Sequence, residues 1–203
     1  MSELLFSTAF SLWGFETSWL ELAAVLLSLG MVLCTITENH WGWPLAALSS
    51  ALYFILFWSQ RLYGDAWLQV LFAALAMWGW SVWLRGVNGV SLPITRMTPR
   101  SRWQMLFLAG LLWLLTGLTL LNLTDTDVPW WDGFPTAVSL IGQYLLARKH
   151  LENWAVWIIV NSVAAGLFAW KELWLTALLY LIFIGLSVVG WRHWASRMNI
   201  NCL

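Results

Sequence analysis

The feature that most constrains this chain is a series of long apolar stretches that are almost free of charge. A helix that crosses about 30 Å of hydrocarbon needs roughly 20 mostly apolar residues. Seven stretches approach this length, and they cover residues 19–37, 43–58, 66–84, 103–121, 134–147, 154–170 and 174–191. The whole chain is 61% hydrophobic and 10% charged, which leaves too few charged side chains to cover a surface in water. The sequence therefore predicts an all-α polytopic membrane protein with seven transmembrane helices.

The composition also argues against several classes of function. Ten basic and ten acidic residues give a net charge of zero, so no basic face is offered to nucleic acid. Cys34 and Cys202 are far apart and suggest neither a disulfide framework nor a metal site. The sequence has no phosphate-binding GxxxxGK[ST] loop and no nucleophile with a visible base. We therefore expect a protein that is not an enzyme and that uses no metal, no cofactor and no nucleic acid.

The basic residues are distributed unevenly between the two ends of the predicted spans. Arg61 and Lys171 lie at one end, and eight lie at the other: Arg85, Arg96, Arg100, Arg102, Arg148, Lys149, Arg192 and Arg197. Short cytoplasmic loops carry an excess of Lys and Arg. The sequence thus predicts a multi-pass protein with its N-terminus outside and its C-terminus in the cytoplasm.

An internal repeat relates the first three spans to the last three at an offset of 111 residues. Trp43 aligns with Trp154, and both copies end in Gly-Trp-x-x-Trp, which begins at Gly79 and at Gly190. One spacer helix between the copies gives both the same direction through the membrane. Parallel three-helix repeats are a known transporter plan, with the substrate site where the repeats meet. The alternative is an old duplication without a transport role.

These observations predict five parts in a three-plus-one-plus-three plan. They are an N-terminal interfacial segment (1–18), a first three-helix repeat (19–84), a loop and linker helix (85–131), a second repeat (132–195) and a cytoplasmic tail (196–203).

Polar side chains inside the spans are candidates for a binding site, because a polar group in hydrocarbon is costly unless it faces a partner or a cavity. Gln143 and Asn161 lie in the middle of their spans, and Tyr53, Gln69 and Tyr180 lie in others. A hydrogen bond between helices is the alternative for each amide taken alone, but several neutral polar groups together favour a cavity. The sequence has no charged side chain or histidine in the middle of a span, which argues against proton coupling.

One helix face combines two indoles with an amide. Trp154, Trp157 and Asn161 are spaced i, i+3 and i+7, so they share a face, and this set suits a flat aromatic ligand with a carboxamide and hydroxyl groups. Indole faces also attract delocalised cations. The alternative for the two tryptophans is a place in the interfacial aromatic belt. The predicted substrate-binding residues are Asn39, Trp43, Tyr53, Gln69, Gln143, Trp154, Trp157, Asn161 and Tyr180.

Several motifs in this order resemble those of the PnuC nicotinamide riboside transporters. They are Trp131-Asp132 before SLIGQYLLARK-x-x-E-Asn-Trp, Trp154-x-x-Trp157-x-x-x-Asn161, Tyr63-x-x-x-x-Leu68-Gln69 and the paired Gly-Trp-x-x-Trp ends, and the resemblance covers residues 19–194. The resemblance implies a fold similar to SWEET sugar transporters and a homotrimer in the bacterial inner membrane. It also implies uptake of nicotinamide riboside by facilitated diffusion, with trapping by a separate cytoplasmic riboside kinase.

Two alternatives stay open from the sequence. The family has relatives for thiamine and riboflavin, so a carrier of thiamine or of another vitamin or nucleoside is possible on the same motifs. A seven-helix membrane receptor is the alternative from another class. The parallel repeat and the lack of a mid-span lysine argue against the receptor, because Lys171 lies in a connection between spans.

Overall fold

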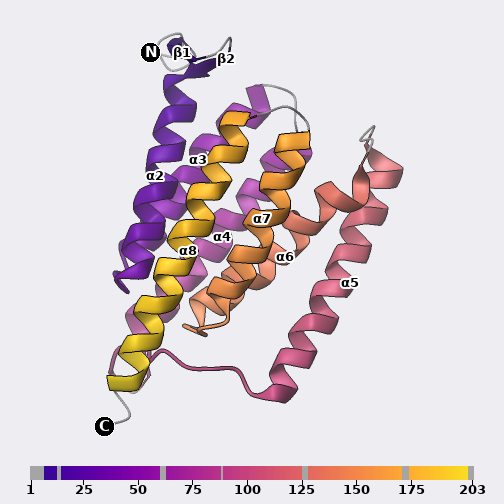
Figure 1. Cartoon of the computed structure of the whole chain (residues 1–203). Coiled ribbons are helices and arrows are strands. Elements are labelled where there is room, and N and C mark those ends of the chain that lie inside the picture. The colour runs from indigo at the N-terminus through magenta and orange to yellow at the C-terminus, as the bar shows by residue number, and fades with distance from the viewer. Residues whose placement is uncertain are drawn as a thin grey trace. The chain divides into compact units, whose positions relative to one another are not determined.

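A computed structural model of the chain describes residues 7–12, 15–59, 63–87, 89–124, 128–170 and 174–200. In chain order the elements are β1 (Thr8–Leu12), β2 (Phe15–Ser18), α2 (Trp19–Ile36), α3 (Gly42–Ser59), α4 (Tyr63–Arg85), α5 (Pro99–Leu123), α6 (Pro129–Ala147), α7 (Asn153–Trp170) and α8 (Trp174–Ile200) (Figure 1). Each helix corresponds to one of the predicted spans, which confirms the fold class. Arg61, Lys171 and Cys202 lie outside the described residues.

The helices form two compact units, residues 1–86 and 87–203. In the first unit α3 packs against both α2 and α4. A short antiparallel hairpin precedes them, with Leu12 opposite Phe15 and Thr8 opposite Ser18. The Ser18 side chain accepts a hydrogen bond from the backbone N–H of Glu21 at 3.2 Å and so caps α2. The hairpin lies in the segment predicted only as interfacial, because strands of five and four residues carry too little alternation to be recognised.

In the second unit α6 packs against α5 on one side and α7 on the other, and α7 packs against α8. Thr98 caps α5 by accepting from Ser101 N at 3.2 Å, and Pro99 takes the first helical position, where its missing N–H costs nothing. The core of this unit is formed by the buried side chains of Met97, Ile141 and Leu145. The linker helix α5 thus belongs to the same unit as the second repeat.

Two helices extend at one end by five or more residues beyond the apolar stretches that predicted them. α6 begins at Pro129 rather than near residue 134, because a proline suits the first helical position and Asp132 in the first turn interacts favourably with the helix dipole. α8 continues to Ile200, beyond the last apolar residues of its span. Helix formation continues where the hydrophobic pattern stops, so hydropathy alone underestimated both lengths.

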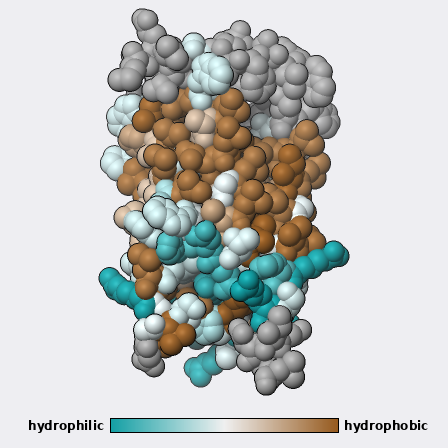
Figure 2. All heavy atoms as spheres, turned by 90° about the vertical axis from the view of Figure 1, so that its left-hand side faces the viewer, coloured by the Kyte–Doolittle hydropathy of each residue, from teal (hydrophilic) through white to brown (hydrophobic). Residues whose placement is uncertain are grey.

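Large apolar side chains cover the outside of the helices. Phe107 is 76% exposed and Leu123 is 77% exposed, and hydrophobic residues cover the middle of the face seen in Figure 2. Within the described residues, six helices are long and apolar enough to cross a membrane; α6 is not among them. α6 instead has a largely buried surface that includes the polar Ser139 and Gln143. Exposed apolar surface on this scale is suited to lipid and is a liability in water.

Candidate functional site

The turn between α6 and α7 places these two helices side by side. Its backbone enters the left-handed region at Lys149 (φ 50°), and the N–H of His150 donates to the carbonyl of Leu145 at 2.9 Å. These bonds satisfy carbonyl groups at the end of α6 and reverse the chain. Residues near the end of α6 therefore meet residues in the first half of α7.

One of these meetings is the contact of Trp157 with Gly142. A Cβ atom added to Gly142 would lie 3.1 Å from Cε2 and 3.3 Å from Cζ2 of the Trp157 ring. The indole therefore rests on bare backbone, and a larger residue would displace it. Trp157 is half-buried, and the next residue along α6 is Gln143. The ring is thus fixed at one edge and partly open elsewhere.

The two amides of this region belong to buried residues and have no hydrogen-bond partner in the described part of the chain. Gln143 is 5% exposed and Asn161 is 6% exposed, and within the described part of the chain no hydrogen bond joins either side-chain amide to another group of the protein. Neither amide is among the fully enclosed polar atoms that lack a partner, so both amides keep a small accessible surface. Asn161 lies one helical turn after Trp157, on the same face of α7. A buried polar group left unpaired costs about 1–3 kcal/mol, so such groups are uncommon unless water or a ligand completes them. Gln143, Trp157 and Asn161 form the candidate site.

Two further predicted residues of the second unit pack against aromatic rings. Tyr180 stacks on Phe168, with ring centroids 5.3 Å apart and an interplanar angle of 14°. Trp154 is 2% exposed and fits over Gly190, and its ring meets Trp194 edge-on at 5.3 Å. Trp154 therefore has a packing role in the fold, whether or not a substrate also reaches it.

The four predicted residues of the first unit have separate surroundings. Asn39 is exposed in the α2–α3 turn, where its side-chain oxygen accepts from the backbone N–H of Trp41 at 3.0 Å. Trp43 is 4% exposed and fits over Gly79. Tyr53 stacks on the next turn of its own helix, and Gln69 is half-buried in α4. Asn39 thus has a turn-forming role, because the short amide side chain satisfies a local backbone donor.

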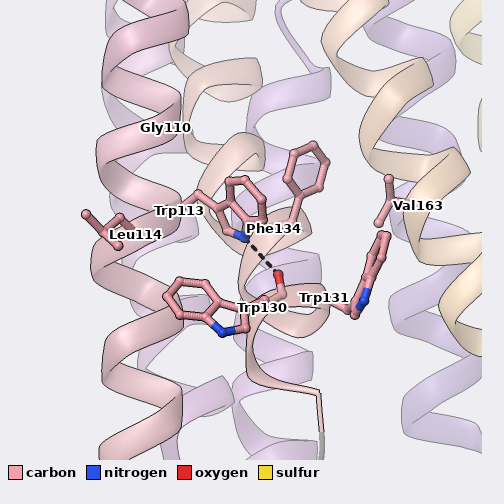
Figure 3. Close-up of a pocket in the computed structure, with 7 residues that line it drawn as sticks. All are labelled: Gly110, Trp113, Leu114, Trp130, Trp131, Phe134 and Val163. Atoms are coloured by element: carbon pink, nitrogen blue, oxygen red, sulfur yellow. Dashed lines mark hydrogen bonds between the residues drawn. The ribbon is translucent and has the colours of Figure 1, made fainter.

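A separate cavity of about 760 Å³ opens between α5, α6 and α7 (Figure 3). Its lining residues are Gly110, Trp113, Leu114, Trp130, Trp131, Phe134 and Val163. In the close-up, Trp113 Nε1 points to the carbonyl oxygen of Trp130 and donates to it at 2.8 Å. The lining is almost entirely apolar and includes none of the nine predicted residues. It offers little to a carboxamide or to hydroxyl groups, so it is not the candidate site.

This cavity was missed because its residues carry no polar signal. In an apolar chain with 19 tryptophans, an aromatic cluster has the same sequence pattern as an interfacial belt. Gly117 lies under the Trp130 ring, a contact that the sequence does not show. Among the described residues no group of three or more His, Cys, Asp or Glu side chains could hold a metal ion.

Comparison with known proteins agrees with the sequence motifs. A profile of the nicotinamide mononucleotide transporter family matches residues 18–196. The chain is 24% identical over 210 residues to the nicotinamide riboside transporter PnuC of Escherichia coli strain K12, covering 90% of this chain and 87% of that one. It is 25% identical over 195 residues to the riboflavin/roseoflavin transporter RibM of Streptomyces davaonensis, covering 94% and 91%.

A solved structure shares the fold. The crystal structure of the vitamin B3 transporter PnuC matches with a TM-score of 0.73 at 22% identity, and the match covers 89% of this chain and 82% of that one.

Proposed function

The chain belongs to the nicotinamide mononucleotide transporter family, the PnuC family that its motifs resemble, and on that premise we propose that it carries nicotinamide riboside across the bacterial inner membrane. The family makes it a membrane transporter rather than an enzyme. The riboside is proposed as substrate because PnuC of Escherichia coli is a riboside transporter and aligns over most of both chains.

The observation that carries the proposal is the pair of amides near Trp157, which belong to buried residues and have no hydrogen-bond partner in the described part of the chain. A nicotinamide group has a carboxamide that both donates and accepts, which is what Gln143 and Asn161 lack in the described structure. Its pyridinium ring is a delocalised cation, and an indole face attracts such a ring most strongly where water is excluded. The other residues of the proposed set come from the sequence alone: Tyr53, Gln69, Tyr180, Trp43, Trp154 and Asn39.

We propose facilitated diffusion with metabolic trapping as the mechanism. The sequence has no Lys, Arg, Asp, Glu or His in the middle of a span and no nucleotide-binding loop, so it has no visible means of coupling to an energy source. An uncoupled carrier only equalises the free substrate on the two sides. A separate cytoplasmic riboside kinase then maintains inward flow by converting the substrate to a phosphate that the site binds poorly.

The orientation and assembly proposed from the sequence have different supports. The outside N-terminus and cytoplasmic C-terminus rest on eight of the ten Lys and Arg residues lying at one end of the spans. The homotrimer rests on the family resemblance. Accessibility of single cysteines to a membrane-impermeant reagent in intact cells tests the orientation, and the mass of the detergent-purified protein tests the trimer.

A flavin is the second candidate substrate, because the RibM relative is as similar to this chain as PnuC and is covered as fully. Riboflavin and nicotinamide riboside both combine a flat aromatic ring system with a polyol or sugar. Uptake of labelled nicotinamide riboside into liposomes that contain the purified protein, competed in turn with riboflavin and thiamine, separates these substrates. Stronger competition by riboflavin than by unlabelled riboside would show that riboflavin, and not nicotinamide riboside, is the preferred substrate.

The same liposomes test the mechanism. Internal riboside should rise to the external concentration and stop, and enclosing a riboside kinase with ATP should drive the total internal label beyond it. Liposomes without protein and liposomes with kinase but no ATP are the controls. Sustained concentration of unmodified riboside by a proton or sodium gradient alone would exclude uncoupled transport. Glu38, a carboxylate in the α2–α3 turn, would then be examined first.

Phosphate discrimination is a further test of the neutral site. Burying an unpaired charge costs several kcal/mol, so nicotinamide mononucleotide should bind far more weakly than the riboside in calorimetry. Comparable affinities would mean that a cation reaches the ligand, and the buried side chain of Lys149, which is 4% exposed in the α6–α7 turn, would be the first to test.

A further inference from the structure

The extended segment before α5 is joined to the α6–α7 turn by backbone hydrogen bonds within the second unit. Thr95 N donates to the carbonyl of Lys149 at 3.0 Å, and Leu151 N donates to the carbonyl of Thr95 at 2.9 Å. Thr95 and His150 form a parallel bridge, and Thr95 Oγ1 lies 3.0 Å from His150 Nδ1. Leu151, whose backbone N–H makes one of these bonds, is 1% exposed. Two segments more than 50 residues apart in sequence are thus paired like short strands.

Glu152 completes this junction with its carboxylate. Both carboxylate oxygens accept from Met97 N at 3.1 Å, and Oε1 also accepts from Arg102 Nη2 at 2.7 Å and from Arg102 Nε at 3.2 Å. The Glu152 side chain is 16% exposed and that of Arg102 is 50% exposed. Charge-assisted bonds to a fixed backbone donor and to a forked guanidinium restrict the carboxylate in direction as well as in distance. Glu152 is therefore held by the segment before α5 and by α5 itself.

The residue that follows Glu152 is the first residue of the helix that carries the candidate site. Asn153 begins α7 and is 0% exposed, and its amide nitrogen donates to the carbonyl of His150 at 2.7 Å. Trp157 lies one turn further along, in tight contact with Gly142. Binding sites tolerate displacements of only about 0.5 Å in their contact residues. A small shift at the start of α7 would therefore move both Trp157 and Asn161 relative to α6.

The first repeat has no such carboxylate at the matching position. Trp41 lies 111 residues before Glu152 and is 58% exposed. A carboxylate anchor at the turn is thus a property of the second copy, the copy that carries the two unpaired amides.

We propose that Glu152 is a positioning residue for substrate binding: its bonds to Met97 N and Arg102 fix the start of α7, and so set Trp157 against Gly142 and fix the position of Asn161 relative to α6. This proposal rests on the proposed function for its substrate. Glu152 is thus added to the residues that determine binding, although it touches no ligand and acts only through α7, the helix that follows it.

The first test does not use a ligand. Hydrogen exchange of the full-length, detergent-purified protein is compared for wild type, Glu152→Gln, Arg102→Ala and the control Arg100→Ala, an exposed arginine in the same first turn of α5. Amides in residues 149–157 should exchange about threefold faster or more in the first two variants, because local opening follows the loss of local contacts. They should be unchanged in the control. Wild-type exchange in both Glu152→Gln and Arg102→Ala would overturn the proposal.

The second test measures binding of nicotinamide riboside by calorimetry on the same proteins. Glu152→Gln and Arg102→Ala should each weaken binding by about three- to tenfold, the range of one net hydrogen bond, and Arg102→Lys should recover part of the loss. Combining Glu152→Gln with Asn161→Ala should cost less than the sum of the two single losses, because part of the effect of Glu152 acts through Asn161. Wild-type affinity in Glu152→Gln, or full additivity with Asn161→Ala, would overturn the positioning role.

The two tests distinguish a failure of this proposal from a failure of the proposed substrate. Should the wild type not bind the riboside, the proposed function fails, and hydrogen exchange alone decides whether Glu152 fixes the start of α7. Should Glu152→Gln fail to fold, Arg102→Ala and Arg102→Lys, which change a half-exposed side chain, decide the question in both assays.

Discussion

The two three-helix repeats share their framework and differ in the residues that could bind a substrate. α2 ends at Ile36 and α6 at Ala147, and α3 begins at Gly42 and α7 at Asn153; both pairs are 111 residues apart. This is the offset at which the sequence aligns with itself. Helices that begin and end at matching residues require matching signals in the chain, and two such signals are visible.

The first shared signal is the turn after the first helix of each repeat. Glu38 (φ 58°) and Lys149 (φ 50°) are the two non-glycine residues with left-handed backbone in the described chain. Asn39 N donates to the carbonyl of Cys34 at 2.8 Å, as His150 N does to that of Leu145 at 2.9 Å. The same turn is thus built from different side chains, because backbone bonds define it.

The second shared signal is a tryptophan that fits over a glycine. Trp43 covers Gly79 and meets Trp83 edge-on at 5.5 Å. In the second copy Trp154 covers Gly190 in the same way. Edge-to-face contact is favourable for aromatic rings, and the glycine lets the indole approach the neighbouring helix closely. The Gly-Trp-x-x-Trp ends are therefore part of the packing between the second and third helices of each repeat.

The difference lies at the candidate site. Where the second copy has Gln143, Trp157 and Asn161, the first has Val32, Ala46 and Ser50. Features kept in both copies are those that fold a three-helix repeat. Features present in one copy are candidates for a role beyond the shared fold, and the two amides without hydrogen-bond partners in the described chain are the clearest of these.

The largest effect expected from this comparison is on substrate binding. Asn161→Ala and Gln143→Ala should each weaken binding of nicotinamide riboside by about ten- to a hundredfold, because a lost partner for a buried polar group costs about 1–3 kcal/mol. Ser50→Ala, the matching position in the first copy, and Ser162→Ala, an exposed neighbour bonded to its own helix, should bind nearly as the wild type does. Calorimetry on detergent-purified protein measures this. Equal losses of affinity in Ser50→Ala and Asn161→Ala would show that the two repeats contribute alike to binding. Unchanged affinity in both Asn161→Ala and Gln143→Ala would mean that the two amides serve only in packing.

A second prediction tests the shared framework. Gly79→Ala and Gly190→Ala should each lower the free energy of unfolding by about 1–3 kcal/mol, because the added methyl overlaps a buried indole and forces the helices apart. Gly185→Ala is the matched control in α8, since a Cβ there meets nothing within 4 Å. Thermal unfolding in detergent gives the comparison. Tolerance at one glycine only would show that the two copies pack differently.

The sequence predicted the helices well and their contacts poorly. Seven apolar stretches of nearly spanning length leave little choice of fold, and Gln143 and Asn161 stood out because an amide is rare in such a stretch. The sequence could not tell whether Trp43 and Trp154 stack on a ligand or pack inside the fold. The internal alignment matches one tryptophan with the other, but it does not show that each ring covers a glycine of the neighbouring helix. The pairing of Thr95 with His150 was not foreseeable, since it joins backbone groups far apart in the chain.

A third prediction concerns the two left-handed residues. An L-residue pays about 1–2 kcal/mol in this conformation, and glycine does not, although it adds entropy to the unfolded chain. Glu38→Gly should therefore stabilise the protein by up to about 1 kcal/mol. Lys149→Gly should gain less, because the Lys149 side chain is 4% exposed and its buried contacts are lost. Chemical or thermal unfolding of both variants measures the difference. A larger gain at Lys149 would mean that its side chain contributes nothing to the second turn.

The smallest expected effect is a pH dependence present in only one of the two turns. Burial of His150 lowers the pKa of its imidazole from the ordinary value of 6.5; Arg148 lowers it further and Glu152 opposes the shift. The unfolded chain therefore binds a proton at a higher pH than the folded one, so the contribution of His150 to stability is complete above pH 6.5 and is lost as the pH falls through the folded pKa. His150→Asn gives the second turn the residue that the first has at Asn39. The thermal midpoint of the wild type should fall more steeply than that of His150→Asn below pH 6.5, and the two should run parallel above it. Parallel curves over the whole range would mean that His150 keeps its ordinary pKa in the fold, and that the contact with Thr95 does not depend on its charge.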